Sequence, residues 1–406
     1  MIKFAHIADV HLGGWRHPEL NSLNSMAFQE AIDSCIEEQV NFVLIAGDLF
    51  DLAMPSVDIL KETVTQLKRL KDFDINCYIV PGSHDYSVTG KTFLDVLEKG
   101  DFCKNVSLLD NNEENITLDI FQNEKVVFAG IPGKKTGLEV DYFKKLKINE
   151  LEKYKDCLKI FLLHTTLTES KPTEMMASID IKSLPEGFDY YAAGHLHIID
   201  IKRKDNAYVV YPGPVFPNNA EELEKLKGGS FFIVNFNENT RQFDLEQKNI
   251  RLKEILTIEI NVDKLPVEQA NAKILKELEN KDSKDKIIIL KIFGCLTSGK
   301  TSDIIFDEIR EKLKESYFLI KNTSKLTTKE FEIELNREDK TIENIESEFI
   351  KQYQSQVQDE FKKFSDLIFP LIENLNFEKK EGEKNEEFNL RVFEIASKIM
   401  DLKNAN

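Results

Sequence analysis

HIADVHLG, residues 6–13, carries an aspartate and a histidine two positions apart, directly after an apolar run. That run, Ile2–Ala8, has the length and the β-branched and aromatic content of a strand. Residues at i and i+2 of an extended segment point to the same side, so Asp9 and His11 present a carboxylate and an imidazole together. The stretch predicts the first strand of an α/β domain and a pair of metal ligands at its carboxyl end.

Four further predicted strands, at 42–46, 75–80, 160–163 and 190–193, end in similar side chains. These side chains are Asp48 and Asp51, then Ser83, His84 and Asp85, then His164, and finally His195 and His197. One such histidine alone is usually a surface or hydrogen-bonded core residue, whereas five histidines and several carboxylates at the ends of five strands indicate a shared site. The ligand crevice of open α/β sheets lies at the carboxyl ends of strands, so we expect these groups to meet at one edge. His6 and His17 lack this placement and are expected to be structural.

The residue types in this set indicate a metal centre. Mixed imidazole and carboxylate ligands suit a borderline transition ion such as Mn²⁺, Fe²⁺ or Zn²⁺. Two such ions about 3.5 to 4 Å apart can hold a bridging hydroxide and clamp a phosphoryl oxygen. Asp51 and Asp85 are expected to orient a ligand or the nearby histidine.

Three parts of the chain differ in pattern. Residues 1–250 alternate strands with helical stretches, which predicts an α/β domain with a mixed sheet. Residues 251–328 predict strand, helix, strand, helix, strand, with the charged run 279–286 as a loop inside this smaller α/β unit. Residues 329–406 predict a helical tail.

The tail has an apolar stripe with helical spacing from Ile342 to Ile368, which predicts one long helix that ends near Phe369–Pro370. A polar linker at 378–387 leads to a last amphipathic helix with Phe388, Val392, Ile395 and Ile399 on one face. Such a stripe can pack on its own domain or lie in the groove of a partner. Two helices joined by a charged linker favour the partner.

GCLTSGKT, residues 294–301, matches the phosphate-loop pattern of nucleotide hydrolases, after a β-branched run and before a helix-like stretch from Ser302. Such hydrolases need a downstream strand that ends in aspartate to hold magnesium. The only strand predicted after Thr301, at 317–322, ends in Lys-Asn-Thr. We therefore expect a glycine turn with Lys300 and Thr301 exposed, and no nucleotide bound by this chain.

Net charge is −17, whereas a protein that binds nucleic acid mainly by counterion release is basic. Any DNA contact must rest on metal ions, a partner or local clusters, each of which we expect to be a solvated patch: Lys134–Lys135, Lys144–Lys145–Lys147 and Lys202–Arg203–Lys204. The five scattered cysteines predict reduced thiols in an intracellular protein. No apolar run is long enough for a membrane span, and a cytoplasmic protein is expected.

Taken in order, the motifs DxH (9–11), GDxxD (47–51), GxHD (82–85), His164 and GHxH (194–197) resemble those of the calcineurin-like metallophosphoesterase superfamily. HIADVHLG and GDLFD resemble the SbcD-type DNA repair exonucleases, the nuclease subunits of the double-strand-break repair complex and counterparts of the eukaryotic meiotic recombination nuclease. Residues 211–234 loosely match the strand-turn segment of that branch. The resemblance implies a mixed-sheet αββα sandwich (1–250), an α/β capping domain (251–328) and a helical region (329–406) that binds the partner ATPase.

The resemblance also implies a role for each site residue. One ion would be held by Asp9, His11 and His197, and the other by His164, His195 and the residue at 83, with Asp48 as the bridge. His84 would be a non-ligand that stabilises or protonates the leaving oxygen, while water held between the ions attacks phosphorus. The superfamily usually has asparagine where this chain has Ser83, so we expect weaker or more Mn-dependent binding of the second ion.

The implied function is a Mn-dependent DNA exonuclease and endonuclease with two Mn²⁺ or other divalent transition ions per chain. Its expected partners are DNA double-strand ends, an SbcC-type coiled-coil ATPase bound through the C-terminal helices, and a second copy in a homodimer, with no membrane. Two alternatives remain open. One is a sister metallophosphoesterase acting on small phosphodiesters or phosphoproteins, and the other is a non-catalytic DNA-repair scaffold.

Overall fold

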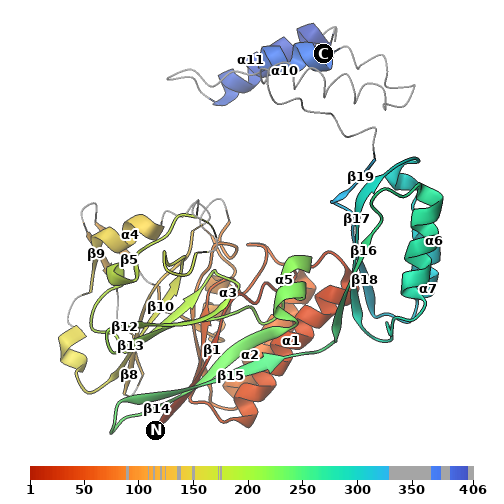
Figure 1. Cartoon of the computed structure of the whole chain (residues 1–406). Helices are drawn as coiled ribbons and strands as arrows, with labels where there is room; N and C mark the ends of the chain where they lie inside the picture. The colour runs from red at the N-terminus through yellow and green to blue at the C-terminus, as the bar shows by residue number, and fades with distance from the viewer. Residues whose placement is uncertain are drawn as a thin grey trace. The chain divides into compact units, whose positions relative to one another are not determined.

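Strand β1 (Ile2–Ile7), which the opening stretch predicts, lies inside a six-stranded sheet of the computed structural model (Figure 1). It pairs in parallel with β2 (Phe42–Ala46), and β3 (Asn76–Val80) and β4 (Lys104–Asn105) continue the parallel order. On its other side β14 (Gly229–Asn237) is antiparallel to β1 and pairs with β15 (Gln242–Ile250), also antiparallel. The sheet is therefore mixed, as predicted.

A second six-stranded sheet comes from the middle of the chain. Its parallel strands are β8 (Val126–Ile131), β10 (Leu158–His164), β11 (Tyr190–Gly194) and β13 (Ala207–Pro212). The strands β7 (Phe121–Asn123) and β12 (Ile199–Lys204) close its two edges in antiparallel pairing.

The two sheets pack face to face through aromatic side chains. Phe4 and Phe42 of the first sheet stack at a ring-centroid distance of 5.1 Å. Phe42 also meets Phe128 of the second sheet edge-on at 5.2 Å. Since neighbouring strand residues alternate between faces, Ala5 and Ile7 pack on the other side, in a core with the helices α1 (Pro18–Glu37) and α2 (Val57–Asp72).

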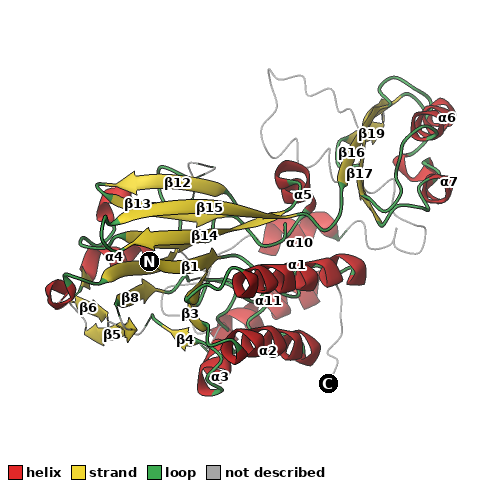
Figure 2. Cartoon of the chain, turned by 90° about the horizontal axis from the view of Figure 1, so that it is seen from below, coloured by secondary structure: helices red, strands yellow, loops and turns green. Residues whose placement is uncertain are grey.

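Helices α1 and α2 lie side by side on the outer face of the first sheet (Figure 2). The outer face of the second sheet packs against α4 (Glu139–Lys145) through Phe143. Helix, sheet, sheet and helix therefore form four layers, which confirms the predicted αββα sandwich. The smaller elements are α3 (Leu94–Lys99), α5 (Ala220–Leu226), the 3₁₀ turns η1 (Leu151–Tyr154) and η2 (Ile181–Ser183), and a three-stranded sheet of β5 (Leu109–Asn112), β6 (Asn115–Leu118) and β9 (Leu146–Lys147).

The structure describes residues 1–328, apart from gaps at 88–90, 108, 113–114, 119–120, 124, 135–138, 149–150, 172 and 174–175, together with 367–375 and 385–400. The chain separates into two compact units, Met1–Lys329 and Glu330–Asn406. The predicted division at residue 250 therefore lies inside the first unit.

Residues 255–328 form a parallel sheet of β16 (Ile255–Asn261), β17 (Ile287–Leu296), β18 (Phe318–Asn322) and β19 (Leu326–Thr328), with helices α6 (Val267–Leu278) and α7 (Phe306–Lys312). The predicted order of strands and helices is confirmed, and β19 is an additional strand. Its core is largely separate, built from residues such as Ile260, Ile274 and Ile292. We call this part the capping unit.

The sequence GCLTSGKT does not have the local structure expected of a phosphate loop. Gly294, Cys295 and Leu296 continue strand β17 and pair with β19. A 3₁₀ turn, η3 (Thr301–Asp303), follows, and the Asp303 carboxylate accepts a hydrogen bond from Lys300 N at 2.8 Å. The predicted exposure of Lys300 and Thr301 is confirmed, whereas the helix predicted from Ser302 begins only at Phe306.

The second unit contains α10 (Ile368–Leu375) and α11 (Asn385–Ile399) in its described residues. Pro370 lies in the first turn of α10, where proline removes no helical hydrogen bond, so the residues of the predicted stop, Phe369–Pro370, are themselves helical. The predicted linker extends too far, because 385–387 are helical, and the long helix over 342–366 lies outside the described residues.

Helix α11 is confirmed, with Phe388, Val392, Ile395 and Ile399 partly buried and Leu390 and Phe393 63% and 68% exposed. None of the helices that the structure describes is both long and apolar enough to cross a membrane.

Candidate metal centre

The predicted ligands come from the ends of five strands, which belong to both sheets. Strands β1, β2 and β3 of the first sheet lead to Asp9, His11, Asp48, Ser83 and His84. Strands β10 and β11 of the second sheet lead to His164, His195 and His197. The prediction that these groups meet at the edge of one sheet is therefore wrong in one respect, because they meet where two packed sheets adjoin.

Sharp backbone turns at the strand ends bring these side chains inward. The φ angles of Asp9, His11 and Asp48 are 51°, 47° and 51°, in the left-handed region that Asp and His tolerate better than most residues. Gly47 has a φ of 86°, and a Cβ there would lie 2.1 Å from His164 Nδ1. Glycine is therefore required next to Asp48, where the two sheets approach each other.

Three overlapping groups of side chains have ligand atoms within 4.8 Å of one another. The groups are Asp9, His11 and His197, then His11, Asp48 and His84, and finally Asp48, His164 and His195. Asp48 belongs to two of them, so a carboxylate stands between the two ends of the cluster.

In the first group, the rings of His11 and His197 present nitrogen to nitrogen, with an Nε2–Nε2 distance of 3.1 Å. The Asp9 side chain is fully buried, and its Oδ1 accepts a hydrogen bond from His195 N at 2.8 Å. Its other oxygen, Oδ2, is buried without a hydrogen-bond partner among the described residues.

In the third group, His164 Nδ1 donates to the Ala46 carbonyl oxygen at 2.9 Å. This leaves Nε2 directed at Asp48, 3.1 Å from Oδ2, yet without a hydrogen bond to any group that the structure describes. Ser83 Oγ donates to the same Asp48 oxygen at 3.5 Å. The side chain of Ser83 therefore lies beside Asp48, as its predicted role requires.

Whether this cluster fits a metal ion can be judged from its unsatisfied atoms. Buried polar atoms without partners are rare in folded proteins. Asp9 Oδ2 and His164 Nε2 are two such atoms in the described part of the chain, and both belong to side chains of the ligand cluster. Imidazole nitrogen and carboxylate oxygen are suitable donors for divalent transition ions, so the residues fit such ions.

The charges in the cluster are strongly coupled. Burial raises the pKa of Asp9 above its usual value. Burial alone would lower the pKa of His164, but the nearby Asp48 and Asp9 carboxylates raise it to about 10. Burial and the neighbouring His164 lower the pKa of His195 to about 3. A cation between these groups would replace a proton, so metal and proton binding compete here.

His84 differs from the other site histidines in exposure. Its side chain is 45% exposed, whereas that of His164 is completely buried. His84 Nδ1 donates to the Asp51 carbonyl oxygen at 2.8 Å, and His84 N donates to Asp48 Oδ1 at 2.8 Å. The ring is therefore oriented by main-chain contacts and leaves Nε2 available.

Asp51 and Asp85 contact different parts of the site. Asp51 Oδ1 accepts from His11 Nδ1 at 3.2 Å, in keeping with a group that orients a histidine. Asp85 instead accepts from the main-chain nitrogens of Gly82, Phe50 and Leu49, at 2.8, 3.0 and 3.3 Å. Asp85 therefore joins the loops after β2 and β3, and it orients Asp48 through the backbone rather than a histidine directly.

Two residues near the site, Asn218 and Glu222, were missed by the sequence analysis. Glu222 Oε1 accepts from His197 Nδ1 at 2.9 Å, and Asn218 Nδ2 donates to Asp51 Oδ1 at 3.2 Å. The segment 211–234, predicted as strand and turn, contains helix α5, which begins with Asn219 as its N-cap. The N-x-x-E spacing from Asn219 to Glu222 is a helix-start signal, but nothing in it indicates His197.

The remaining histidines, the cysteines and the basic clusters named in the sequence analysis do not belong to the three groups of candidate ligands. His6 is fully buried and its Nδ1 lies 3.0 Å from Tyr190 Oη, and His17 is exposed with its ring 4.8 Å from that of Phe318. All five cysteines are free thiols. In the predicted basic clusters, Lys202 pairs with Asp200 at 3.0 Å. Lys135 lies outside the described residues, as do the side chains of Lys144 and Lys147.

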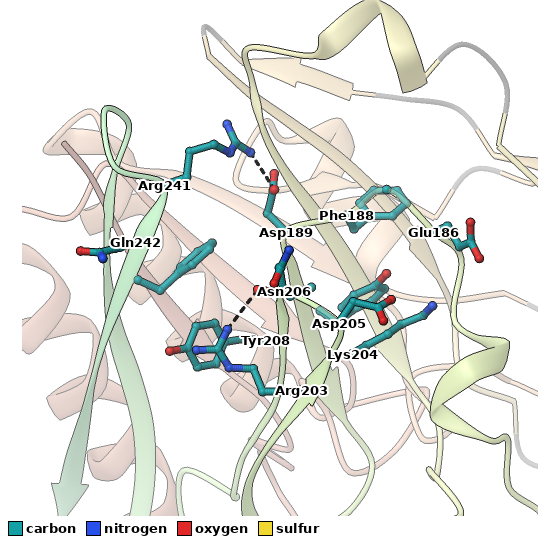
Figure 3. Close-up of a pocket in the computed structure, with 14 residues that line it drawn as sticks. Glu186, Phe188, Asp189, Arg203, Lys204, Asp205, Asn206, Tyr208, Arg241 and Gln242 are labelled. Atoms are coloured by element: carbon teal, nitrogen blue, oxygen red, sulfur yellow. Dashed lines mark hydrogen bonds and ion pairs between the residues drawn. The ribbon is translucent and has the colours of Figure 1, made fainter.

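A cavity of about 870 Å³ lies away from the metal-ligand cluster. Its lining includes Asp189 and Arg241, whose side chains pair at 2.6 Å, and Arg203, whose guanidinium covers the Tyr208 ring (Figure 3). Asp189 precedes the first residue of β11, whereas His195 follows its last. The cavity is therefore at the opposite end of this strand, and two of its charged groups, Asp189 and Arg241, neutralise each other.

Comparison with known proteins agrees with this geometry. A profile of the calcineurin-like phosphoesterase family matches residues 2–198, which contain every candidate ligand. Residues 2–198 are therefore similar to a calcineurin-like phosphoesterase domain, and the chain is a metal-dependent phosphoesterase.

Proteins that are similar over most of the chain indicate a narrower class of phosphoesterase. This chain is 24% identical over 387 residues to the DNA double-strand break repair protein Mre11 of Saccharolobus solfataricus, covering 92% of this chain and 95% of that protein. It is 27% identical over 372 residues to Mre11 of Archaeoglobus fulgidus, with 82% and 80% covered. It is 28% identical over 374 residues to Mre11 of Methanococcus maripaludis, with 86% and 91% covered. A solved structure from Thermus thermophilus aligns with 62% of this chain and 99% of its own at 15% identity and a TM-score of 0.41.

Proposed function

We propose that this chain is a Mn²⁺-dependent DNA exonuclease and endonuclease of a double-strand-break repair complex. The observation that carries this proposal is the position of Asp48, which shares ligand distance with His11 on one side and with His164 and His195 on the other. One carboxylate between two imidazole groups is the arrangement that two neighbouring ions require.

Each predicted ligand has a place in this scheme. Asp9, His11 and His197 would hold one ion, and His164, His195 and Ser83 would hold the other, with Asp48 available to both. When bound, the ions supply Lewis-acid activation of water and neutralise charge on the phosphoryl group. Asp51 and the Ala46 carbonyl hold the tautomers of His11 and His164, so that each Nε2 is free to bind.

His84 acts on the leaving oxygen rather than on an ion. Its Nδ1 is committed to the Asp51 carbonyl, so its Nε2 is free for the substrate. The half-exposed ring can reach a phosphodiester that enters from solvent, whereas buried His164 cannot. A histidine so placed stabilises or protonates the departing oxygen as a general acid.

DNA is favoured as the substrate because the similarity extends beyond the phosphoesterase domain. The relatives named for double-strand break repair match up to 92% of this chain, including the capping unit. With a net charge of −17, the chain must hold DNA through its ions and partners. The proposed partners are an SbcC-type coiled-coil ATPase, bound by the C-terminal helices, and a second copy of the chain, in the cytoplasm on the nucleoid.

Cleavage of labelled duplex DNA with Mn²⁺ by the wild type and by His84→Ala tests this proposal. We expect the wild type to cut the duplex and the variant to lose cutting while it retains its fold. Hydrolysis of bis-p-nitrophenyl phosphate without DNA cleavage would favour a sister phosphoesterase of small phosphodiesters. Neither activity, with both metal sites loaded, would favour a non-catalytic scaffold.

A further inference from the structure

The Glu222 carboxylate reaches His197 from helix α5, outside the five strands that lead to the ligands. His197 Nδ1 and Glu222 Oε1 are 2.9 Å apart, and each side chain is only 19% exposed. A carboxylate oxygen offers lone pairs alone, so the proton of this hydrogen bond is on Nδ1. The lone pair of His197 is therefore on Nε2.

The partner of His197 Nε2 is His11 Nε2, at 3.1 Å. His11 Nδ1 also has a carboxylate behind it, that of Asp51 at 3.2 Å. Both rings thus keep their protons on the outer nitrogens and direct lone pairs at the same space beside Asp9. Two lone pairs at this distance repel each other unless a cation lies between them.

Asn218, which lies just before helix α5, contacts the carboxylates behind both rings, those of Glu222 and Asp51. Asn218 N donates to Glu222 Oε2 at 2.8 Å, while Asn218 Nδ2 donates to Asp51 Oδ1 at 3.2 Å. Asn219 Nδ2 donates to Glu222 Oε1 at 2.6 Å. The carboxylate thus has three donors and a fixed direction, which is what a group that orients a ligand needs.

Glu222 also has an ordinary structural explanation. Its main-chain N–H donates to Asn219 Oδ1 at 2.9 Å, and its carboxylate reaches back to the first turn, as in a helix cap. A cap alone would leave the metal site unchanged if it were removed, apart from the loss of helix stability. The two roles therefore predict different results for metal binding.

We propose that Glu222 is a positioning residue that fixes the tautomer and the ring orientation of His197 for the first metal ion. The inference rests on the proposed binuclear centre and adds a group outside the strand-end motifs. The two oxygens of Glu222 accept from different donors, Oε1 from His197 and Oε2 from Asn218 N, and a glutamine keeps only one acceptor oxygen. Glu222→Gln is therefore a near-isosteric test.

Calorimetric titration of the full-length, metal-free chain with Mn²⁺ alone tests this. We expect Glu222→Gln and Glu222→Ala to weaken one of two binding events about 10- to 100-fold and to leave the other unchanged. The matched control is Glu221→Gln, which removes the neighbouring carboxylate of the same helical turn, one that pairs with Lys225. We expect it to change neither affinity.

Circular dichroism and melting temperature show whether each variant is folded. Two wild-type ions with unchanged affinities in both Glu222 variants would overturn the positioning role alone. Equal weakening in Glu221→Gln would also overturn it, because the effect would then follow the charge of the first helical turn and not the contact with His197. A folded wild type that binds no Mn²⁺ would overturn the metal centre itself and the inference with it.

Discussion

His84 Nδ1 donates a hydrogen bond to the main-chain carbonyl of Asp51 at 2.8 Å, so the ring orientation depends on the loop after β2. The same ring lies 4.8 Å from the His11 ring, and His84 shares ligand distance with His11 and Asp48. Geometry thus allows two roles, a further ligand or a proton donor. The exposure of the His84 side chain, 45%, favours the role of proton donor.

The first prediction separates these roles by metal content. His84→Ala should retain two Mn²⁺ per chain while DNA cleavage falls about 10²- to 10⁴-fold, the usual contribution of a general acid. Elemental analysis after desalting gives the stoichiometry, and His164→Ala serves as the control that loses an ion. Loss of an ion from His84→Ala as well would show that His84 is a ligand.

The second prediction concerns Ser83, which donates to Asp48 Oδ2 over a long 3.5 Å. An asparagine reaches further and offers a carboxamide oxygen, a better donor to a cation than a hydroxyl. Ser83→Asn should tighten the second Mn²⁺ by on the order of tenfold, since one improved polar contact contributes about 1.5 kcal/mol. Titration calorimetry of both proteins measures this, and two ions held equally tightly in the wild type would contradict it.

A third prediction concerns the pH dependence of stability. Glu38 accepts hydrogen bonds from Lys248 and Lys3, at 2.8 and 2.5 Å, and these lower its pKa from 4.5 to about 2. A depressed carboxyl pKa stabilises the fold above the unfolded-state value, and this stabilisation disappears as pH falls through 4.5 towards 2. Because the Glu38 side chain is 31% exposed, the effect should be only about 0.5 kcal/mol.

Urea unfolding of Glu38→Gln and the wild type should therefore differ at pH 7 and converge as the pH approaches 2. The exposed neighbour Glu37 provides the control, since Glu37→Gln should match the wild type throughout. A difference between wild type and Glu38→Gln that grows on acidification would contradict this assignment.

The fourth prediction uses the boundary between the two compact units at Lys329 and Glu330. Deletion of residues 331–406 should leave hydrolysis of bis-p-nitrophenyl phosphate intact, because the candidate ligands all lie in the first unit. The same deletion should abolish co-purification with the SbcC-type ATPase. Phe393→Glu in the full chain, at a side chain 68% exposed, should weaken association without affecting folding. Retained association in the deletion would refute docking through the tail.

The strand ends of the site could be predicted from sequence because their signals are local. Asp9, Asp48 and His164 each follow an apolar run closely enough for the pattern to indicate both the strand and its end. The assignment of strands to two sheets could not be predicted, because it depends on packing such as that of Phe42 on Phe128.

Edge strands and distant contacts were harder to predict. Strand β12 has no apolar run, because its residues alternate between exposed and partly buried. The sequence therefore predicts only a basic surface patch at Lys202–Arg203–Lys204. Glu222 could not be found because its contact with His197 spans 25 positions and depends on where α5 lies. Long-range hydrogen bonds of this kind have no local signal.

The division of the ligands between two sheets also affects how activity arises during synthesis. A nascent chain that ends before residue 164 contains Asp9, His11, Asp48 and His84 but none of the imidazoles that follow β10 and β11. Such a fragment, whether released early by the ribosome or cut by a protease, has only one side of the centre. A cluster with both sets of candidate ligands therefore exists only after residue 197 has been added and the two sheets have packed together.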